Sequence, residues 1–403
     1  MPAPSVTRSA RPPQQRVLRN HERLVDAAVE AADEDGWAGL NFANVAARAG
    51  LSRRPLQDRF SDSSHLAAAA WTERADPALR GALADVLTAG GLLGGEPNVN
   101  DLIAAMEVLA HPDAELRASA ELMLVSQFDL VLRAAVRDGL GSQIEAWCTP
   151  EPKQLTRADA ARRAYLISLG LGLLLAGHRP GIGGIDLRHE IRLLATALAV
   201  PAKPIALPRA RARHLDEPTP FDTGDVTLDA LLQAVLDQVG ADGFDGASVE
   251  RIVAAAGSSQ GALFGRYETK LDLFIDATRR QQAISMRTNH EYIQRIAASH
   301  GAGVADAVTL REFQRPGREL PRAHLMEQLR ISWHEGTLLL AQEEELEAFA
   351  HGEFIVGVVR TRKQVPGYVH VGYALGLGAT ALPVLFPACW TLPYDVVTIP
   401  LLG

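Results

Sequence analysis

Two distant stretches of this chain align with each other, and this internal repeat limits what the chain can fold into. Residues 24–66 align without a gap with residues 231–273, at a shift of 207 positions. The short motif Leu169–Gly172 (LGLG) recurs as Leu375–Gly378 at a shift of 206. Solenoid repeats have periods of about 20–50 residues. A unit of about half the 403 residues therefore indicates a duplicated whole protein. Matched positions in the longer pair include Gly36/Gly243, Gly50/Gly257, Ser52/Ser259, Leu56/Leu263, Arg59/Arg266 and Leu66/Leu273.

The composition is that of a globular protein from a reducing compartment. Hydrophobic residues make up 47% and charged residues 22% of the chain, which is enough apolar material for sizeable cores. The two cysteines, Cys148 and Cys389, are far apart and form no metal-ligand pattern. No apolar stretch follows the basic N-terminus, so no signal peptide is expected and a cytoplasmic location is predicted. The net charge of −8 argues against a protein that coats nucleic acid nonspecifically, but it permits a local basic surface.

Each copy of the repeat has the pattern of two short helices joined by a tight turn. In the first copy, Asn41 is predicted to cap a helix over 42–49, which Gly50 ends. Ser52 is then predicted to cap a second helix over 53–60. This arrangement is a helix-turn-helix, whose second helix places its first turn in the major groove of DNA. The corresponding residues of the second copy are Ser248, 249–256, Gly257, Ser259 and 260–267.

The sequence around the second predicted helix resembles the TetR family of regulators. The runs AARAGLSRRPLQDRF and AAAGSSQGALFGRYETKLDLF are similar to the family pattern A-x-x-A-G-[VS]-S-x-G-x-[LF]-Y-x-[YH]-F. In the first copy, Gln57 replaces the usual aromatic residue and Ser63 replaces the lysine. The second copy resembles the pattern more closely, through Gly261, Phe264, Tyr267, Thr269 and Lys270.

The resemblance implies an all-α fold of two TetR-like units, each with an N-terminal three-helix helix-turn-helix domain and a helical regulatory domain. Family members dimerise through their last two long helices, and a small inducer in an apolar regulatory pocket respaces the recognition helices. Because both units lie in one chain, we expect an intramolecular pseudo-dimer. The expected parts are a basic flexible arm (1–20), helix-turn-helix domain 1 (21–70), regulatory domain 1 (71–200), a linker (201–226), helix-turn-helix domain 2 (227–275) and regulatory domain 2 (276–403).

The LGLG motifs fall where the resemblance places the dimer helices. We predict that helices over 163–176 and 369–382 pack on each other, since their glycines allow close approach; glycine loosening an ordinary buried helix is the alternative. The charge-free stretch 364–394 is long enough to span a bilayer, but its prolines favour a buried helix followed by a loop. The first half closes with an amphipathic helix over 186–199, which the short segment 395–403 cannot match. The four glycines are Gly170, Gly172, Gly376 and Gly378.

The two reading heads are predicted to contact DNA through different residues. Arginine suits guanine edges and glutamine suits adenine edges, so unlike heads predict an asymmetric operator. From Arg8 to Arg59 there are nine arginines and seven acidic residues, whereas from Arg209 to Lys270 there are six basic and ten acidic residues. The basic segments 8–19 and 209–213 are candidates for minor-groove arms or for solvated tails. The candidate DNA-binding residues are Asn41, Ser52, Arg53, Arg54, Gln57, Arg59, Ser248, Ser259, Gln260, Phe264, Arg266 and Lys270.

No P-loop, GxSxG, HExxH or similar motif occurs, so we predict no enzyme, no metal and no cofactor. The leading hypothesis is a ligand-responsive transcriptional repressor, a monomeric pseudo-dimer or a further homodimer, that binds double-stranded operator DNA and no membrane. The alternative is a TetR-like scaffold with one or both heads decayed, which acts by binding a ligand or protein. A small apolar or amphipathic effector is expected, although core packing is the alternative role for its candidate pocket residues, which are Met106, Met123, Phe128, Trp147, Met326 and Trp333.

Overall fold

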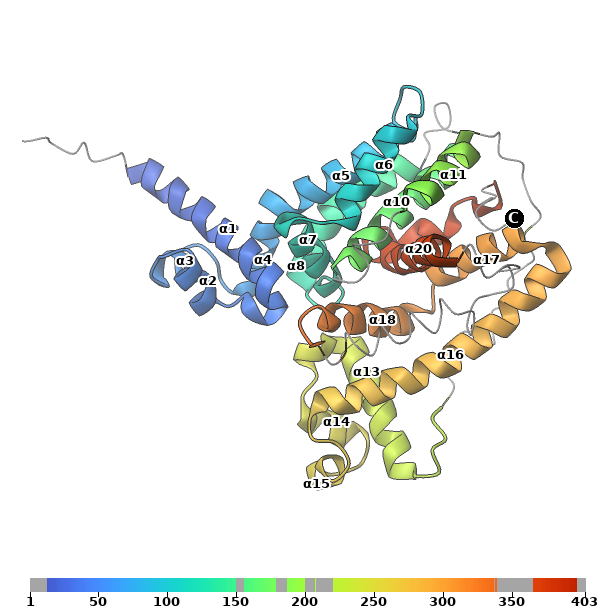
Figure 1. Ribbon diagram of the computed structural model, residues 1–403. Helices are drawn as coiled ribbons and strands as arrows, with labels where there is room; N and C mark the ends of the chain where they lie inside the picture. Colours follow the sequence, from blue (N-terminus) through green and yellow to red (C-terminus); the bar gives the residue numbers. More distant parts are fainter. Residues whose placement is uncertain are drawn as a thin grey trace, which may run out of the picture.

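The computed structural model describes residues 13–149, 156–178, 187–199, 207, 220–336, 338 and 365–396. Every regular element in these ranges is a helix, and none is a strand. The predicted all-α fold is thereby confirmed. Figure 1 shows one helix-turn-helix at the left of the molecule, the other at the bottom, and the remaining helices packed above and to the right of both.

The first half of the chain contributes a head and a body of stacked helices. The head consists of α1 (Pro13–Gly39), α2 (Phe42–Arg48), α3 (Arg54–Gln57) and α4 (Ser63–Ala70). A π-helical turn, Trp71–Ala75, leads from α4 directly into the body, and a second one, Arg137–Gly141, joins α8 to α9. The body helices are α5 (Asp76–Ala89), α6 (Val99–Ala110), α7 (Ala114–Val125), α8 (Leu130–Val136), α9 (Ser142–Cys148), α10 (Arg157–Gly177) and α11 (Arg188–Ala199).

The second half has the same head, but its body has fewer helices among the described residues. Its α16 runs unbroken from Lys270 to His300, where the first half has α4, a π-helical turn and α5. Helical 3-10 turns at Pro387–Thr391 and Tyr394–Val396 follow the last helix. The helices are α13 (Val226–Gly246), α14 (Val249–Ala255), α15 (Gln260–Phe264), α16, α17 (Ala302–Gln314), α18 (Glu319–Ser332) and α20 (Val365–Leu385).

Buried apolar side chains form two clusters of unequal size. The larger runs from head 1 through the first body and takes in Met326 of α18, Leu382 of α20 and Tyr394. The smaller is built around the second head, on residues such as Leu263 of α15 and Phe274 of α16. Burying a large apolar side chain stabilises a fold by about 1.5–3 kcal/mol. The second body is therefore held by the core of the first half, whereas the second head has a core of its own.

The two LGLG helices, α10 and α20, touch each other through one glycine from each motif. A Cβ atom built on Gly172 would lie 1.6 Å from the carbonyl oxygen of Ala374. A Cβ atom built on Gly378 would lie 1.6 Å from the carbonyl oxygen of Ser168. The two backbones can approach this closely only because both positions lack a side chain.

The other glycine of each motif plays no part in this contact. Gly170 faces Leu83 and Leu109 of its own half, and Gly376 has open space around it. By length and composition α10 could cross a membrane, but 83% of its apolar window is buried inside the protein. Residues 365–394 of the charge-free stretch form α20 and the 3-10 turns that follow it. Both apolar segments therefore serve the core.

Two expected boundaries differ in the structure. Residues 13–20, predicted as part of a flexible arm, form the first turns of α1, which begins at a proline suited to a helix start. The expected boundary between 275 and 276 falls inside α16, because no glycine or proline interrupts that helix. The basic segment 209–213 and residues 1–12 lie outside the described residues.

Candidate nucleic-acid interface

Both heads are attached to the body through the same backbone kink. α1 is interrupted at Gly36 (φ 64°) and α13 at Gly243 (φ 73°), positions that correspond in the repeat. This left-handed backbone conformation favours glycine. Each kink redirects the chain into the helix-turn-helix that follows.

The N–H group after each kink donates a hydrogen bond to a buried glutamate of the body. Trp37 N donates to Oε1 of Glu121 in α7 at 2.7 Å, and Phe244 N donates to Oε1 of Glu327 in α18 at 2.6 Å. The two glutamates lie 206 positions apart, the same shift as the LGLG motifs. A hydrogen bond from a backbone N–H to a carboxylate is stronger than one between neutral groups. These two bonds therefore fix the orientation of each head relative to the body.

The first turn of the helix-turn-helix in head 1 forms as predicted. Asn41 caps α2, since its side chain accepts a hydrogen bond from Asn44 N at 3.0 Å. Gly50 makes the turn with φ 61°. Leu56 and Phe60 point into the core of the head.

Ser52 does not cap the second helix of head 1, and this prediction was wrong. The helix α3 covers only Arg54–Gln57, and its N-cap position, Arg53, makes no side-chain cap. A capping serine accepts a hydrogen bond from the N–H two or three residues later. The residue three positions after Ser52 is Pro55, which has no N–H. In head 2 the corresponding residues are Ser259 and Ala262. Ala262 N donates a hydrogen bond to the Ser259 hydroxyl at 3.1 Å, so Ser259 caps α15.

The second helix of head 1 presents a basic exposed face. Ser52, Arg53, Arg54, Gln57 and Arg59 are all exposed. Arg54 lies 4.0 Å from Asp58, and its side chain is 87% exposed. Arg59 is directed back toward α1, because its Nη2 donates to the carbonyl oxygen of Val17 at 2.8 Å. Arg53 at the N-cap and Arg54 and Gln57 in α3 are thus the side chains of this face best placed to reach a DNA groove.

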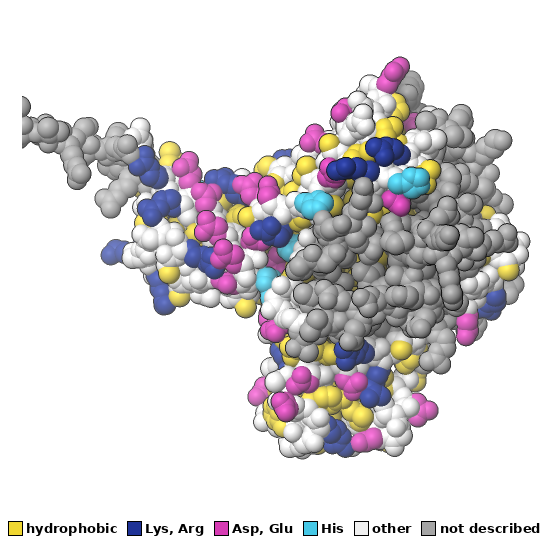
Figure 2. Space-filling view, viewed as in Figure 1, with side chains coloured by type: hydrophobic (Ala, Val, Ile, Leu, Met, Phe, Trp, Pro, Cys, Tyr) yellow, Lys and Arg dark blue, Asp and Glu magenta, His cyan; other side chains and the backbone are white. Residues whose placement is uncertain are grey.

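The same face of head 2 is less basic. Phe264 is 49% exposed, and the Gln260 amide donates to Glu250 at 3.1 Å. Arg266 is paired with Asp225 at 2.7 Å, a contact that lowers the pKa of that carboxyl. Ser248 caps α14, accepting from Arg251 N at 3.3 Å. Figure 2 shows basic and acidic side chains interspersed on the visible face of both heads.

Lys270 points into head 2 and away from its exposed face. Its Nζ donates to the carbonyl oxygens of Phe244 and Ala247 at 2.7 and 2.8 Å. The ammonium also lies 4.0 Å from the centre of the Phe244 ring, and burial lowers the pKa of Lys270. Lys270 therefore binds carbonyl oxygens at the C-terminal end of α13. The predicted DNA contact through this residue would require these bonds to break.

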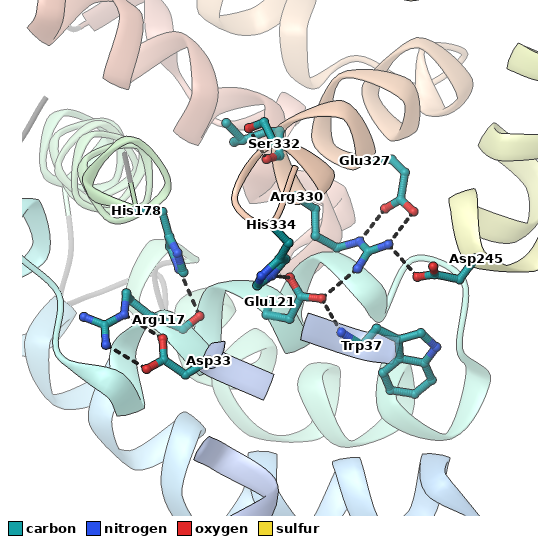
Figure 3. Close-up of polar contacts among 11 residues, drawn as sticks. Asp33, Trp37, Arg117, Glu121, His178, Asp245, Glu327, Arg330, Ser332 and His334 are labelled. Atoms are coloured by element: carbon teal, nitrogen blue, oxygen red, sulfur yellow. Dashed lines mark hydrogen bonds and ion pairs between the residues drawn. The ribbon is translucent and has the colours of Figure 1, made fainter. Parts of the chain in front are cut away.

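One buried arginine joins the glutamates that hold the two heads. Arg330 of α18 lies 2.7 Å from Glu121, 2.8 Å from Glu327 and 2.8 Å from Asp245. Figure 3 shows its guanidinium group between these three carboxylates, which we call the Arg330 cluster together with Arg330 itself. Both glutamates are at most 1% exposed. Because the carboxylates come from α7, α18 and the end of α13, the cluster connects both bodies with head 2.

The charges within the cluster stabilise one another. Burial alone would raise the pKa of Glu121, but Arg330 and His334 bring that pKa below its ordinary value. Burial would lower the pKa of Arg330, whereas Glu121 and Glu327 hold it well above its usual range. Both partners are therefore charged at neutral pH, and each offsets the other's loss of hydration.

A second set of contacts beside the cluster joins head 1 to the body. Arg117 of α7 binds both carboxylate oxygens of Asp33 in α1, at 2.6 and 2.7 Å. The carbonyl oxygen of Arg117 accepts a hydrogen bond from His178 at 3.1 Å. The His178 ring stacks on Trp333, with ring centres 3.9 Å apart. His178, which follows α10, thus contacts Arg117 of the first half and Trp333 of the second half.

We expect His178 to make stability fall in mild acid. Burial lowers its pKa to about 4, below about 6.5 in an unfolded chain. The unfolded state therefore takes up the proton first, so stability is complete above about pH 6.5 and is lost as pH falls toward 4, by about 2 kcal/mol at pH 5. Urea unfolding at pH 7 and pH 5 measures this loss, and His178→Phe, which keeps the stacked ring, should reduce it. Asp33, Arg117 and Glu121 face the ring in both proteins. An equal loss in the variant would contradict the assignment.

The candidate pocket residues lie in different surroundings. Trp333 stacks on His178, and Phe128 lines a cavity between the heads. The remaining four are part of the large core, namely Met106, Met123, Trp147 and Met326.

A comparison with known protein families finds a match at head 2. Residues 231–277 match the family model described as bacterial regulatory proteins, tetR family. The second head therefore resembles the TetR-type domain. The match begins in α13, includes α14 and α15, and ends in α16, so it contains the whole second helix-turn-helix. Head 1 has the same order of helices and the same glycine kink. No curated protein sequence matches the chain.

Proposed function

We propose that this protein is a TetR-like transcriptional regulator with two unlike reading heads in one chain, working as an intramolecular pseudo-dimer. The observation that carries the proposal is the repeated attachment of the heads. In both halves a glycine kink precedes an exposed helix-turn-helix and is bonded to a body glutamate, Glu121 or Glu327. The TetR-type match of head 2 supports DNA as the partner. We further propose that the protein is cytoplasmic and represses transcription in response to a ligand.

The exposed residues of the heads favour an asymmetric operator. Head 1 offers Arg53, Arg54 and Gln57, whereas head 2 offers Gln260 and Phe264. Arginine pairs best with guanine and glutamine with adenine, while an aromatic ring suits a thymine methyl group. A symmetric dimer reads a palindrome because its two heads are identical. Two unlike heads have no such requirement.

One observation favours the alternative of a scaffold with a decayed second head. The cations of head 2 are already engaged, Arg251 with Asp242, Arg266 with Asp225, and Lys270 with backbone carbonyls. Phosphate contacts by free cations supply most nonspecific affinity for DNA. In this alternative the chain acts by binding a ligand or a protein.

Binding-site selection from random DNA tests the proposal. We expect an enriched site whose two halves differ. The double variant Arg53→Ala/Arg54→Ala should bind that site about tenfold or more weakly, with a salt dependence reduced by about one to two phosphates. Fluorescence anisotropy at several salt concentrations measures both effects.

A matched control is the double variant Arg188→Ala/Arg192→Ala, which removes two exposed arginines from α11 in the body. It should leave DNA affinity unchanged. Enrichment of a perfect palindrome would refute the asymmetric operator, and failure to enrich any sequence would favour the scaffold.

A further inference from the structure

A cavity of about 260 Å³ lies where the two heads meet the body. Its wall takes Trp37 from the kink of head 1 and Asp242, Asp245 and the intervening Gly243 from the kink of head 2. Phe128 and Asp129, just beyond α7, and Glu327 and Arg330, on α18, complete it with Val125 and Gly246. The cavity therefore touches both points where a head changes direction.

The wall combines carboxylates with aromatic rings. Four lining residues are acidic and one, Arg330, is basic; the acidic ones are Asp129, Asp242, Asp245 and Glu327. Trp37 and Phe128 are only half-buried. A Cβ atom on Gly243 would come within 3.0 Å of the Phe128 ring, so the glycine leaves that ring room beside the kink. An excess of negative charge beside aromatic faces suits a cation with an apolar body.

The carboxylates differ in how strongly they are already engaged. Glu327 is 1% exposed and held by Arg330 and Phe244 N. Asp245 is exposed, and its carboxylate is paired with the same guanidinium. If Asp245 pairs with another cation, Arg330 still has ion pairs with the buried Glu121 and Glu327. Of the two carboxylates that Arg330 holds in the cavity wall, Asp245 is therefore the one that a second cation can recruit at the lower cost. Asp242 is paired with Arg251, and Asp129 accepts hydrogen bonds from Ser64 and Leu132 N.

We propose that this cavity binds a small organic cation with an aromatic or apolar body. The positive group would pair with Asp245, and the apolar body would cover the exposed faces of Trp37 and Phe128. The volume lies just below the range of about 300–1,000 Å³ of sites for drug-sized ligands, which limits the ligand to a compact molecule. The site differs from the predicted pocket within a regulatory body, because its wall includes residues of both heads.

Benzyltrimethylammonium is a suitable probe, since it joins a compact cation to one aromatic ring. Isothermal titration calorimetry with the full chain should show saturable binding of one equivalent. Asp245→Asn and Trp37→Leu should each weaken it roughly tenfold, about 1.4 kcal/mol. The control Asp237→Asn removes an exposed carboxylate of the same helix outside the cavity and should change the affinity less than about twofold.

Benzenesulfonate, which carries the opposite charge on a similar ring, should not bind. Absence of saturable heat with benzyltrimethylammonium, equal binding of benzenesulfonate, or unchanged affinity in both cavity variants would each overturn the proposal. Thermal unfolding of the variants confirms that they are folded. The titration uses free protein, so a negative result leaves the proposed DNA-binding function untouched.

Discussion

Replacing Gly172 with alanine should destabilise the chain by about 1–3 kcal/mol or more. The new Cβ atom would lie 1.6 Å from the carbonyl oxygen of Ala374, a separation that only movement of one helix backbone can relieve. α10 and α20 belong to the two halves of the chain, so the strain acts on the contact that joins them. Gly378→Ala should have a similar effect through Ser168. Denaturant unfolding followed by circular dichroism measures the loss.

Gly376→Ala is the matched control, because it lies in the same helix and motif as Gly378 but has nothing within 4 Å of the added atom. Alanine favours a helix over glycine by about 0.5–1 kcal/mol, so this variant should be neutral or slightly more stable. If all three variants unfold alike, the close crossing of α10 and α20 is not what stabilises the chain.

Replacing Arg330 with leucine should cost about 3–5 kcal/mol, the usual effect of removing one partner from a buried ion pair. Glu121 and Glu327 would stay buried without their cation. The control is Arg157→Leu, which breaks an ion pair with Asp395 that also spans the two halves. Arg157 is 72% exposed, so its loss should cost at most about 1 kcal/mol. Urea unfolding at pH 7 compares the two.

The pH dependence of the Arg330→Leu protein gives a second, independent test. In the native cluster the pKa of Glu121 is lowered, so its contribution is present above the unfolded pKa of about 4.3 and is lost as pH falls below it. Without Arg330, burial raises that pKa, and protonation then favours the folded state. Stability of the variant relative to wild type should therefore recover as pH falls from 7 to 5. A constant difference between the two proteins would contradict this role for Arg330.

The helix-turn-helix arrangement could be predicted from sequence because its signals are local. Gly36, Gly50 and the capping Asn41 each determine the backbone within a few residues, and the structure has them in these roles. The cap at Ser52 failed for an equally local reason, the missing N–H of Pro55. The head boundary at 275 could not be found, since α16 continues through it without a change in sequence pattern.

The Arg330 cluster left no signal that pattern analysis could use. Glu121 is the one acidic residue in the otherwise uncharged second half of α7, and its partner lies 209 positions away. An isolated charge of this kind usually faces solvent. Extending the 206-position shift of the LGLG motifs upstream would have paired Glu121 with Glu327 and Ser126 with Ser332. That pairing identifies the two glutamates that accept hydrogen bonds from the kinks, but only the fold brings Arg330 between them.

The single arginine of this cluster is a charge that the proposed pseudo-dimer carries in one half alone. The position that corresponds to Arg330 in the first half is Leu124. In an assembly of two identical chains every substitution appears twice, once on each side of the symmetry axis. An arginine here would then come with a second one, and two guanidinium groups would compete for the same pair of glutamates. In the proposed pseudo-dimer both units belong to one chain and that restriction does not apply, so an odd number of charges can occupy the junction, and each half can change without the other.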